Sequence, residues 1–151
     1  MEITRNGIAT RRGPAEWFTG EVHLVPVAEP GDGGRISAAR VHFAPGARTA
    51  WHTHPHGQTI HISEGIGLVQ RRGGPVEVVR PGDRVFFPPD EEHWHGAAPD
   101  QLMVHLAMAE VDGEGVAARW GDHVTGEEYA QAPPRSHRNG VKPCGARSPR
   151  A

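Results

Sequence analysis

The sequence predicts an all-β fold in a single domain, and three observations support this. The chain has 151 residues, which is a usual length for one domain. It contains 20 Gly and 14 Pro, which indicates many turns rather than long helices. Its apolar residues fall in short runs between these turns. Many short antiparallel strands favour a closed barrel or jelly roll, because closure removes exposed sheet edges.

The first four predicted strands cover residues 21–27, 35–43, 49–54 and 58–63. The first two alternate in side-chain character, as in EVHLVPV and RISAARVHF, and the segment PGA follows the second. The last two flank the segment PHG, which is typical of a turn. We therefore expect the last two strands to form a hairpin.

The next four predicted strands cover residues 67–71, 76–79, 84–87 and 93–96. The segment RGGP separates the first pair, RPGD precedes the third strand, and PPDEE precedes the fourth. We expect a longer strand at residues 102–110, which read LMVHLAMAE. A last extended segment is expected at residues 116–120.

The only helix signal lies near residue 125. Thr125 and Glu128 have the spacing of a capping box, in which each side chain binds a backbone N–H at the start of a helix. We expect one short helix there.

Alternation along two of the strands predicts the wall of a ligand cavity. In the strand 102–110, the residues Met103, His105, Ala107 and Ala109 share one face, and they combine an imidazole with mostly small side chains. A barrel interior that leaves room for a ligand has this composition. In the strand 35–43, the set of Ala39, Val41 and Phe43 is the better cavity wall, because the opposite set contains Arg40 and His42.

Charge divides the chain into two parts. All 18 acidic residues lie in residues 1–131, which we interpret as the folded domain. Residues 132–151 carry five Lys or Arg, no acid and four Pro. Such a segment buries too little apolar surface to fold, so we expect a disordered basic tail. An acidic body argues against a dedicated nucleic-acid binder.

The remaining composition bears on location and partners. Cys144 is the single cysteine, so no intrachain disulfide framework is expected. The first twenty residues lack the apolar core of a signal peptide, and no apolar run is long enough to cross a membrane. We expect a cytoplasmic protein without nucleic-acid or membrane partners, acting on a small-molecule substrate.

Four histidines and a glutamine form the strongest functional signal. His52 and His54 are two residues apart, so on a strand both side chains point to the same side. His93 and His95 repeat this spacing on a later strand, and Gln58 opens the strand that follows the turn. Three imidazoles and one amide oxygen converging from neighbouring strands predict a metal site. Structural zinc is not expected, because those sites are closed and usually contain cysteine.

The segment PGARTAWHTHPHGQTIHISEG resembles the first motif of the cupin family. Gly46, His52, His54 and Gly65 occupy the positions of that motif, and Gln58 stands where most cupins have Glu. The resemblance implies a double-stranded β-helix, that is, a jelly-roll barrel with a short C-terminal helix.

The segment PGDRVFFPPDEEHWHG is similar to the second cupin motif. Gly82, Pro88 and His93 are in place, whereas Asp90 stands where that motif usually has Gly, and its terminal Asn is absent.

The segments GPAEWFTG, FAPGARTAWHTHPHGQT, EEHWHGAAP and HVTGEEY look like those of the small bacterial cupin hydroxynitrile lyases. That resemblance covers roughly residues 1–130. It implies a manganese-dependent enzyme that cleaves cyanohydrins to an aldehyde or ketone and hydrogen cyanide. The metal ligands carried over by motif are His52, His54, Gln58 and His93.

The same resemblance implies that His95 and His105 reach the cavity without binding the metal, and that Thr49 lies nearby. It also implies Ala39 and Val41 as cavity residues and a homo-oligomer, a dimer or tetramer. Ligands of this kind also suit iron, nickel, cobalt or zinc, so the residues alone predict a divalent metal.

Gln58 favours redox-neutral chemistry. Three neutral imidazoles and a neutral amide leave the full charge of a divalent cation in place, which strengthens its attraction for an alkoxide or cyanide. In the mechanism we expect, His105 or His95 removes the proton of the substrate hydroxyl, and the other imidazole receives the cyanide. The residues do not distinguish the base from the acid.

Three alternatives remain open at this stage. One is another metal-dependent cupin enzyme, such as a dioxygenase of flavonols or small thiols, or a different lyase. A second is a non-catalytic cupin that binds a sugar or an effector, although no helix-turn-helix pattern accompanies it. The third is a metal-free structural cupin, which the four ligand-type residues disfavour.

Overall fold

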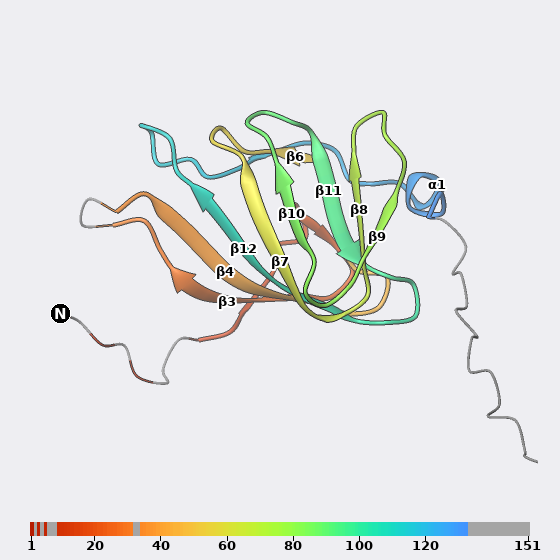
Figure 1. The fold of residues 1–151 in the computed structure, drawn as a ribbon, viewed down its shortest axis with the longest axis horizontal. Helices are drawn as coiled ribbons and strands as arrows, with labels where there is room; N and C mark the ends of the chain where they lie inside the picture. The colour runs from red at the N-terminus through yellow and green to blue at the C-terminus, as the bar shows by residue number, and fades with distance from the viewer. Residues whose placement is uncertain (2, 4, 6–8, 32–33, 133–151) are drawn as a thin grey trace, which may run out of the picture.

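Two curled antiparallel sheets face each other in the structure, a computed structural model that describes residues 1, 3, 5, 9–31 and 34–132 (Figure 1). The first sheet has, in spatial order, β1 (Arg11–Arg12), β3 (Val22–Ala28), β4 (Ile36–Phe43), β12 (Met103–Glu110), β7 (Gln58–Gly65) and β10 (Arg84–Phe87). The second has β13 (Arg119–Trp120), β6 (His52–Thr53), β11 (His93–Ala97), β5 (Arg48–Thr49) and β2 (Phe18–Thr19), with β8 (Gly67–Arg71) beside β11 and β9 (Glu77–Val79) beside β8. The predicted all-β jelly roll is confirmed.

Most predicted strands are present, and two have exactly the expected bounds, β8 and β10. The expected strand 49–54 is wrong as a single element, because it is broken between β5 and β6. At the break the N–H groups of Ala50 and Trp51 donate to the carbonyl oxygens of Trp17 and Asp122, outside the regular ladder. Of the expected piece 116–120, only β13 is a strand.

The core lies between the two sheets and consists of the inward side chains that alternation predicts. Ile60 and Ile62 on β7 are fully buried, while His61 between them is exposed. Val41 and Phe43 on β4 are buried in the same core. This packing holds β4, β12 and β7 in register, and those three strands also bear the cavity wall.

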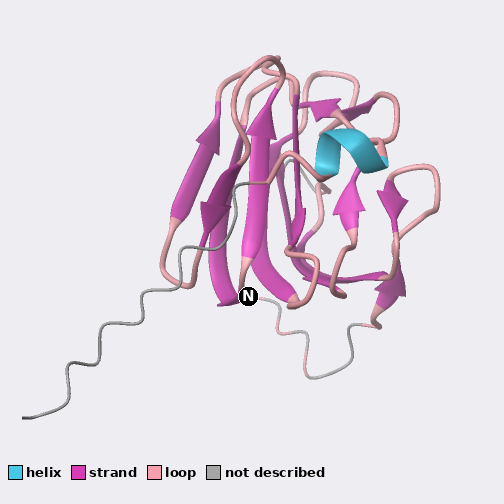
Figure 2. Ribbon diagram, turned by 90° about the vertical axis from the view of Figure 1, so that its right-hand side faces the viewer, coloured by secondary structure: helices cyan, strands magenta, loops and turns pink. Residues whose placement is uncertain are grey.

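A second, smaller core covers the outer face of the second sheet. Trp51, Leu68 and Trp94 are buried there against the segment that carries α1 (Gly126–Tyr129), and Figure 2 shows this helix against the strands. The predicted capping box of Thr125 and Glu128 is present in both directions.

No helix in the described part of the chain has the length and apolar character that a membrane span requires. The predicted basic tail lies outside the described residues, apart from Ala132.

Candidate metal centre

The structure brings the two histidine pairs together at one end of the second sheet. His52 on β6 lies directly opposite His93 on β11, and the centroids of their rings are 4.4 Å apart. The ring of His54 lies 5.1 Å from that of His52 and 5.5 Å from that of His93. Gln58 is the first residue of β7 and contacts His93. The four residues predicted as ligands therefore form one cluster.

Two turns hold the backbone of His54 in this cluster. The N–H of Gly57 donates to the carbonyl oxygen of His54 at 3.1 Å, and the N–H of Asp90 donates to the same oxygen at 2.9 Å. Both turn residues have positive φ, +79° for Gly57 and +61° for Asp90. Asp90 thus adopts the left-handed conformation at the motif position where glycine is usual, which Asp tolerates better than most residues.

Backbone carbonyls orient three of the imidazoles in the same way. Nδ1 of His52 lies 2.9 Å from the oxygen of Ala50, Nδ1 of His54 lies 2.6 Å from that of Ala117, and Nδ1 of His93 lies 2.7 Å from that of Glu91. A carbonyl oxygen only accepts, so each Nδ1–H donates and each neutral ring keeps its lone pair on Nε2. This is the orientation that metal-binding histidines take from their surroundings.

The Nε2 atoms then lie in a buried space without matching donors. Nε2 of His52 and Nε2 of His54 are buried and have no hydrogen-bond partner. Nε2 of His93 lies 3.3 Å from Oε1 of Gln58, so two acceptor atoms face each other. Buried acceptors without donors are costly, and a cation among them would satisfy all of these lone pairs. The donor set present fits a divalent metal ion.

Among the described residues, His52, His93 and His95 form a group that could hold such an ion. One ring nitrogen from each of them lies within 4.8 Å of the other two. This group contains His95 in place of His54. The two histidines differ in their remaining contacts. Both ring nitrogens of His95 have partners, Oε1 of Gln58 at 3.2 Å and Nε2 of His105 at 3.2 Å. His54 keeps its Nε2 free.

His105, His95 and Gln58 form a buried chain of contacts. His105 on β12 reaches Nδ1 of His95 through its Nε2, and His95 reaches Oε1 of Gln58 through its own Nε2. Since the amide oxygen accepts, His95 donates from Nε2, and His105 then donates to Nδ1 of His95. Thr49 supports the chain from the side, because its Oγ1 accepts from the backbone N–H of His95 at 3.1 Å.

Burial keeps all these imidazoles neutral. Burial is the main cause that lowers the pKa of His93 and that of His105 to about 3 each. The pKa values of His52 and His95 also lie well below the ordinary value, first because of burial and then because of the neighbouring imidazoles. A neutral imidazole is the form that binds a metal.

A cavity of about 380 Å³ adjoins the cluster and has the size of a small-molecule site, about 300–1,000 Å³. His54 and Gln58 form part of its wall. The other lining residues are mostly apolar and comprise Trp17, Ser37, Ala39, Ala107, Met108, Ala109, Val116, Ala117, Ala118 and Trp120.

The predicted cavity residues divide into two groups. Ala39, Ala107 and Ala109 line the cavity. Val41 and Met103 do not line it, because they lie further along β4 and β12 within the hydrophobic core, with 5% and 0% of their surfaces exposed. Alternation predicted that these side chains point into the barrel, but not that they lie in the packed core rather than beside the cavity.

Two tryptophans, Trp17 and Trp120, form an aromatic part of the wall that the sequence did not predict. Trp17 and Trp120 stack with a centroid distance of 5.1 Å and an angle of 7° between their planes. The other side of Trp120 stacks on His52 at 4.6 Å. Trp17 precedes β2 and Trp120 ends β13, so no local pattern links them. The pairing of β13 with β6, in which Trp120 is opposite His52, brings β13 to the site.

Comparisons with known proteins agree with this geometry. The cupin domain family matches residues 39–109. The (R)-mandelonitrile lyase of Granulicella tundricola is 53% identical over 131 residues, which cover 85% of this chain and 98% of that protein.

Solved structures share the fold. A cupin-like protein from Thermotoga maritima superimposes with a TM-score of 0.75 at 39% identity, over 80% of this chain and 91% of the other. A polyketide cyclase from Streptomyces resistomycificus has a TM-score of 0.62 at 21% identity, over 88% and 94%, and this likeness concerns the fold alone. By its fold, its match to the cupin domain family and its 39% identity to a cupin-like protein, the chain belongs to the cupin family.

Proposed function

We propose that the chain is a cupin lyase that cleaves cyanohydrins to an aldehyde or ketone and hydrogen cyanide, and that also forms them in reverse. The observation that carries this proposal is the 53% identity to a mandelonitrile lyase along 98% of that protein. The buried histidine cluster beside a cavity of about 380 Å³ supports it.

The proposed metal ligands are His52, His54, Gln58 and His93, and the proposed ion is manganese. The backbone-anchored Nδ1 atoms and the unpartnered Nε2 atoms of His52 and His54 support this set. His95 is not included, because its Nδ1 contacts the imidazole of His105, whereas the Nδ1 atoms of the three proposed histidine ligands are held by backbone carbonyls. When bound, the divalent cation supplies a Lewis-acid position for the hydroxyl oxygen of the substrate.

The proposed proton path uses His95 and His105. Gln58 lines the cavity, His95 contacts Gln58, and His105 contacts His95, so the two imidazoles follow one another away from the cavity wall. In cleavage, the imidazole pair takes the hydroxyl proton, the C–O bond becomes a carbonyl, and the electron pair of the broken C–C bond stays on cyanide. The pair then returns one proton to cyanide, which leaves as hydrogen cyanide, so the imidazoles end in their initial protonation state. The buried Nδ1 of His105 has no hydrogen-bond partner, so one lone pair of the imidazole pair is available to take a proton.

The cavity wall fits a substrate with an apolar group. Small side chains from β4 and β12, Ala39, Ala107 and Ala109, leave the space open, and the Trp17–Trp120 pair offers an aromatic surface. Aromatic cyanohydrins are therefore the substrate class that we propose.

We also propose a homo-oligomer, a dimer or tetramer, which light scattering on the purified protein would measure.

The test is benzaldehyde release from (R)-mandelonitrile at a pH low enough to keep the spontaneous reaction slow. Protein loaded with manganese is compared with protein treated with a chelator and with a His52→Ala variant. We expect release with the loaded protein alone. No release above background from the loaded protein would refute the lyase. Oxygen consumption by an iron-loaded sample would then favour an oxygen-using cupin.

A further inference from the structure

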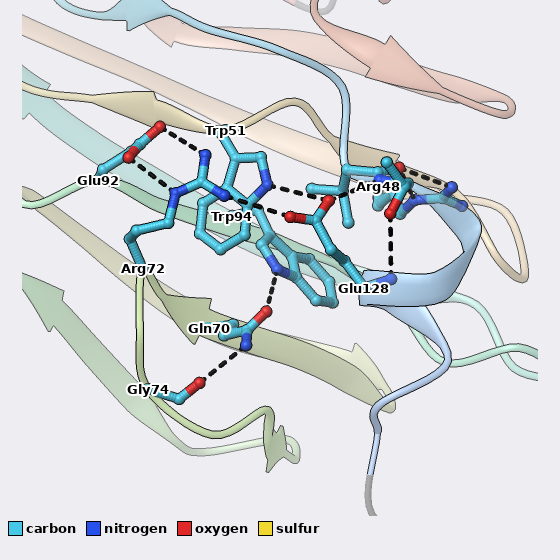
Figure 3. A network of polar contacts seen from close by, with 10 residues as sticks. Arg48, Trp51, Gln70, Arg72, Gly74, Glu92, Trp94 and Glu128 are labelled. Carbon is cyan, nitrogen blue, oxygen red and sulfur yellow. Dashed lines mark hydrogen bonds and ion pairs between the residues drawn. The ribbon is translucent and has the colours of Figure 1, made fainter.

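Figure 3 shows a network of contacts that joins Arg72 to Glu92, Trp51 and Glu128. Arg72 binds both carboxylate oxygens of Glu92, with distances of 2.8 Å and 2.9 Å. Its guanidinium also lies over the ring of Trp51, 3.7 Å from the ring centroid, and reaches Oε1 of Glu128 at 3.2 Å. One side chain thus makes a two-pronged ion pair, a cation–π contact and a second ion pair.

The two main partners of Arg72 stand next to two histidines of the centre. Trp51 immediately precedes His52, and Glu92 immediately precedes His93. His52 and His93 are the pair that face each other across β6 and β11, with ring centroids 4.4 Å apart. Trp51 and Glu92 lie immediately before β6 and β11, and their side chains contact Arg72, whereas the side chains of His52 and His93 contact each other.

Backbone contacts complete the connection. The N–H of Arg72 donates to the carbonyl oxygen of Glu92 at 2.8 Å. The backbone of Trp51 is bound on both sides by the segment after β13, through Asp122 at 2.9 Å and Gly121 at 2.7 Å. The end of β8, the start of β11 and the segment before β6 are therefore joined at Arg72.

Glu128 extends the network to helix α1. Its Oε2 accepts from the backbone N–H of Thr125 at 2.8 Å, in the capping box, and from Nε1 of Trp51 at 3.4 Å. Its Oε1 accepts from Arg72. The helix start, Trp51 and Arg72 are thus linked through one carboxylate.

We propose that Arg72 is a positioning residue for the metal centre, which fixes the separation of His52 and His93 by clamping Trp51 against Glu92. The inference rests on the metal site proposed above. A role in overall stability is the alternative. It is the weaker explanation, because the side chains of Arg72 and Glu92 are 46% and 39% exposed, and ion pairs this exposed contribute little to stability. Their planar, two-pronged geometry instead constrains position.

The test compares metal binding by the wild-type protein with that of Arg72→Met, Arg72→Lys and Glu92→Gln. The dissociation constant for Mn²⁺ is measured from the electron paramagnetic resonance signal of the free ion. The visible absorption spectrum at saturating Co²⁺ reports the geometry around the ion. Both are recorded well below the unfolding temperature of each variant. Arg11→Met is the matched control, since Arg11 also forms a 2.8 Å ion pair, with Glu29, but on the edge strand β1.

We expect Arg72→Met to bind Mn²⁺ about tenfold more weakly, the lower end of the range for residues that support metal ligands. We also expect a changed Co²⁺ spectrum. Arg72→Lys should not restore either property, because an ammonium group cannot pair with both carboxylate oxygens while stacking on Trp51. Arg11→Met should match the wild type.

Wild-type binding constants and spectra in Arg72→Met, even with a lower unfolding temperature, would overturn the inference. Restoration by Arg72→Lys would also overturn it, because charge alone would then suffice. A double variant that combines Arg72→Met with Glu92→Gln should bind Mn²⁺ about as weakly as the weaker of the two single variants, and full additivity of the two effects would exclude the clamp. If Arg72→Met does not fold, Arg72→Lys and Glu92→Gln decide. Failure of the wild-type protein to bind either metal would instead refute the metal site itself.

Discussion

His54 donates from Nδ1 to the carbonyl oxygen of Ala117 over 2.6 Å, and this contact joins the cavity wall to the histidine cluster. Ala117 belongs to the segment 116–118 that lines the cavity. His54 is a proposed metal ligand whose Nε2 is free. A change that displaces this segment should therefore alter the cavity and the metal site together.

Asp112 holds that segment and provides the first prediction. Its Oδ1 accepts from the backbone N–H of Glu114 at 3.0 Å and of Val116 at 2.9 Å, and its Oδ2 accepts from Arg119 at 2.9 Å. We expect Asp112→Ala to raise the dissociation constant for Mn²⁺ by about tenfold, as for other residues that support ligands, and to raise KM. Binding measurements and steady-state kinetics on the same samples check this.

Asp112→Asn is the matched control for that experiment. It keeps an acceptor oxygen for both backbone N–H groups, but it loses the charge and the acceptor oxygen that face Arg119. We expect nearly wild-type metal binding. If the alanine variant also binds normally, the coupling between cavity wall and metal site is refuted.

Gln58→Glu tests why an amide stands among the histidines. A carboxylate would reduce the net positive charge of the loaded site, and each pKa unit of lost acidification of the substrate hydroxyl lowers its ionised fraction about tenfold. We therefore expect retained metal binding and turnover lower by about tenfold or more. Metal content and kcat for (R)-mandelonitrile are measured together. Unchanged kcat at full metal content would contradict this role.

The sequence predicts each histidine pair because spacing determines which residues of one strand share a side. His52 and His54, or Ile60 and Ile62, follow this rule in the structure. It also predicts the turn at Gly57, where a positive φ requires glycine. These features depend only on neighbours in the chain.

Other features of the site depend on tertiary contacts and could not be predicted locally. Trp17 and Trp120 stack although about a hundred positions separate them. The two strands missed by sequence, β1 and β2, have only two residues each, too few for alternation to be recognised. Whether Val41 and Met103 lie in the core or beside the cavity depends on where along the barrel the packed core ends.

The Trp17–Trp120 pair provides a prediction on substrate preference. Trp17 lines the cavity and is 37% exposed, so its loss should alter the cavity more than the core. Aromatic pairs contribute about 0.5–1.5 kcal/mol beyond area burial. We expect Trp17→Ala to lower kcat/KM for mandelonitrile by about two- to tenfold, with a smaller loss for an aliphatic cyanohydrin. Trp17→Phe should retain most of the preference, and an equal loss for both substrates would contradict an aromatic subsite.

Acid should unfold the metal-free protein at a pH where most small domains stay folded. Burial lowers the pKa of His105 and of His93 from 6.5 to about 3, so the folded chain keeps both neutral in a range where the unfolded chain takes up protons. Their stability contribution is therefore fully present above about pH 6.5 and is lost as the pH falls towards 3. The free energy of unfolding should fall by up to about 1.4 kcal/mol per pH unit for each such histidine.

Urea unfolding at several pH values between 7 and 4, with a chelator present, measures this dependence. His105→Phe should show a shallower loss of stability with falling pH, because it removes one buried group that the unfolded chain protonates. Phenylalanine suits the site, since His105 packs beside Phe43 with ring centroids 5.3 Å apart. A variant of the exposed His61, His61→Gln, should keep the wild-type slope. An unchanged slope in His105→Phe would show that burial of this imidazole does not govern the acid response.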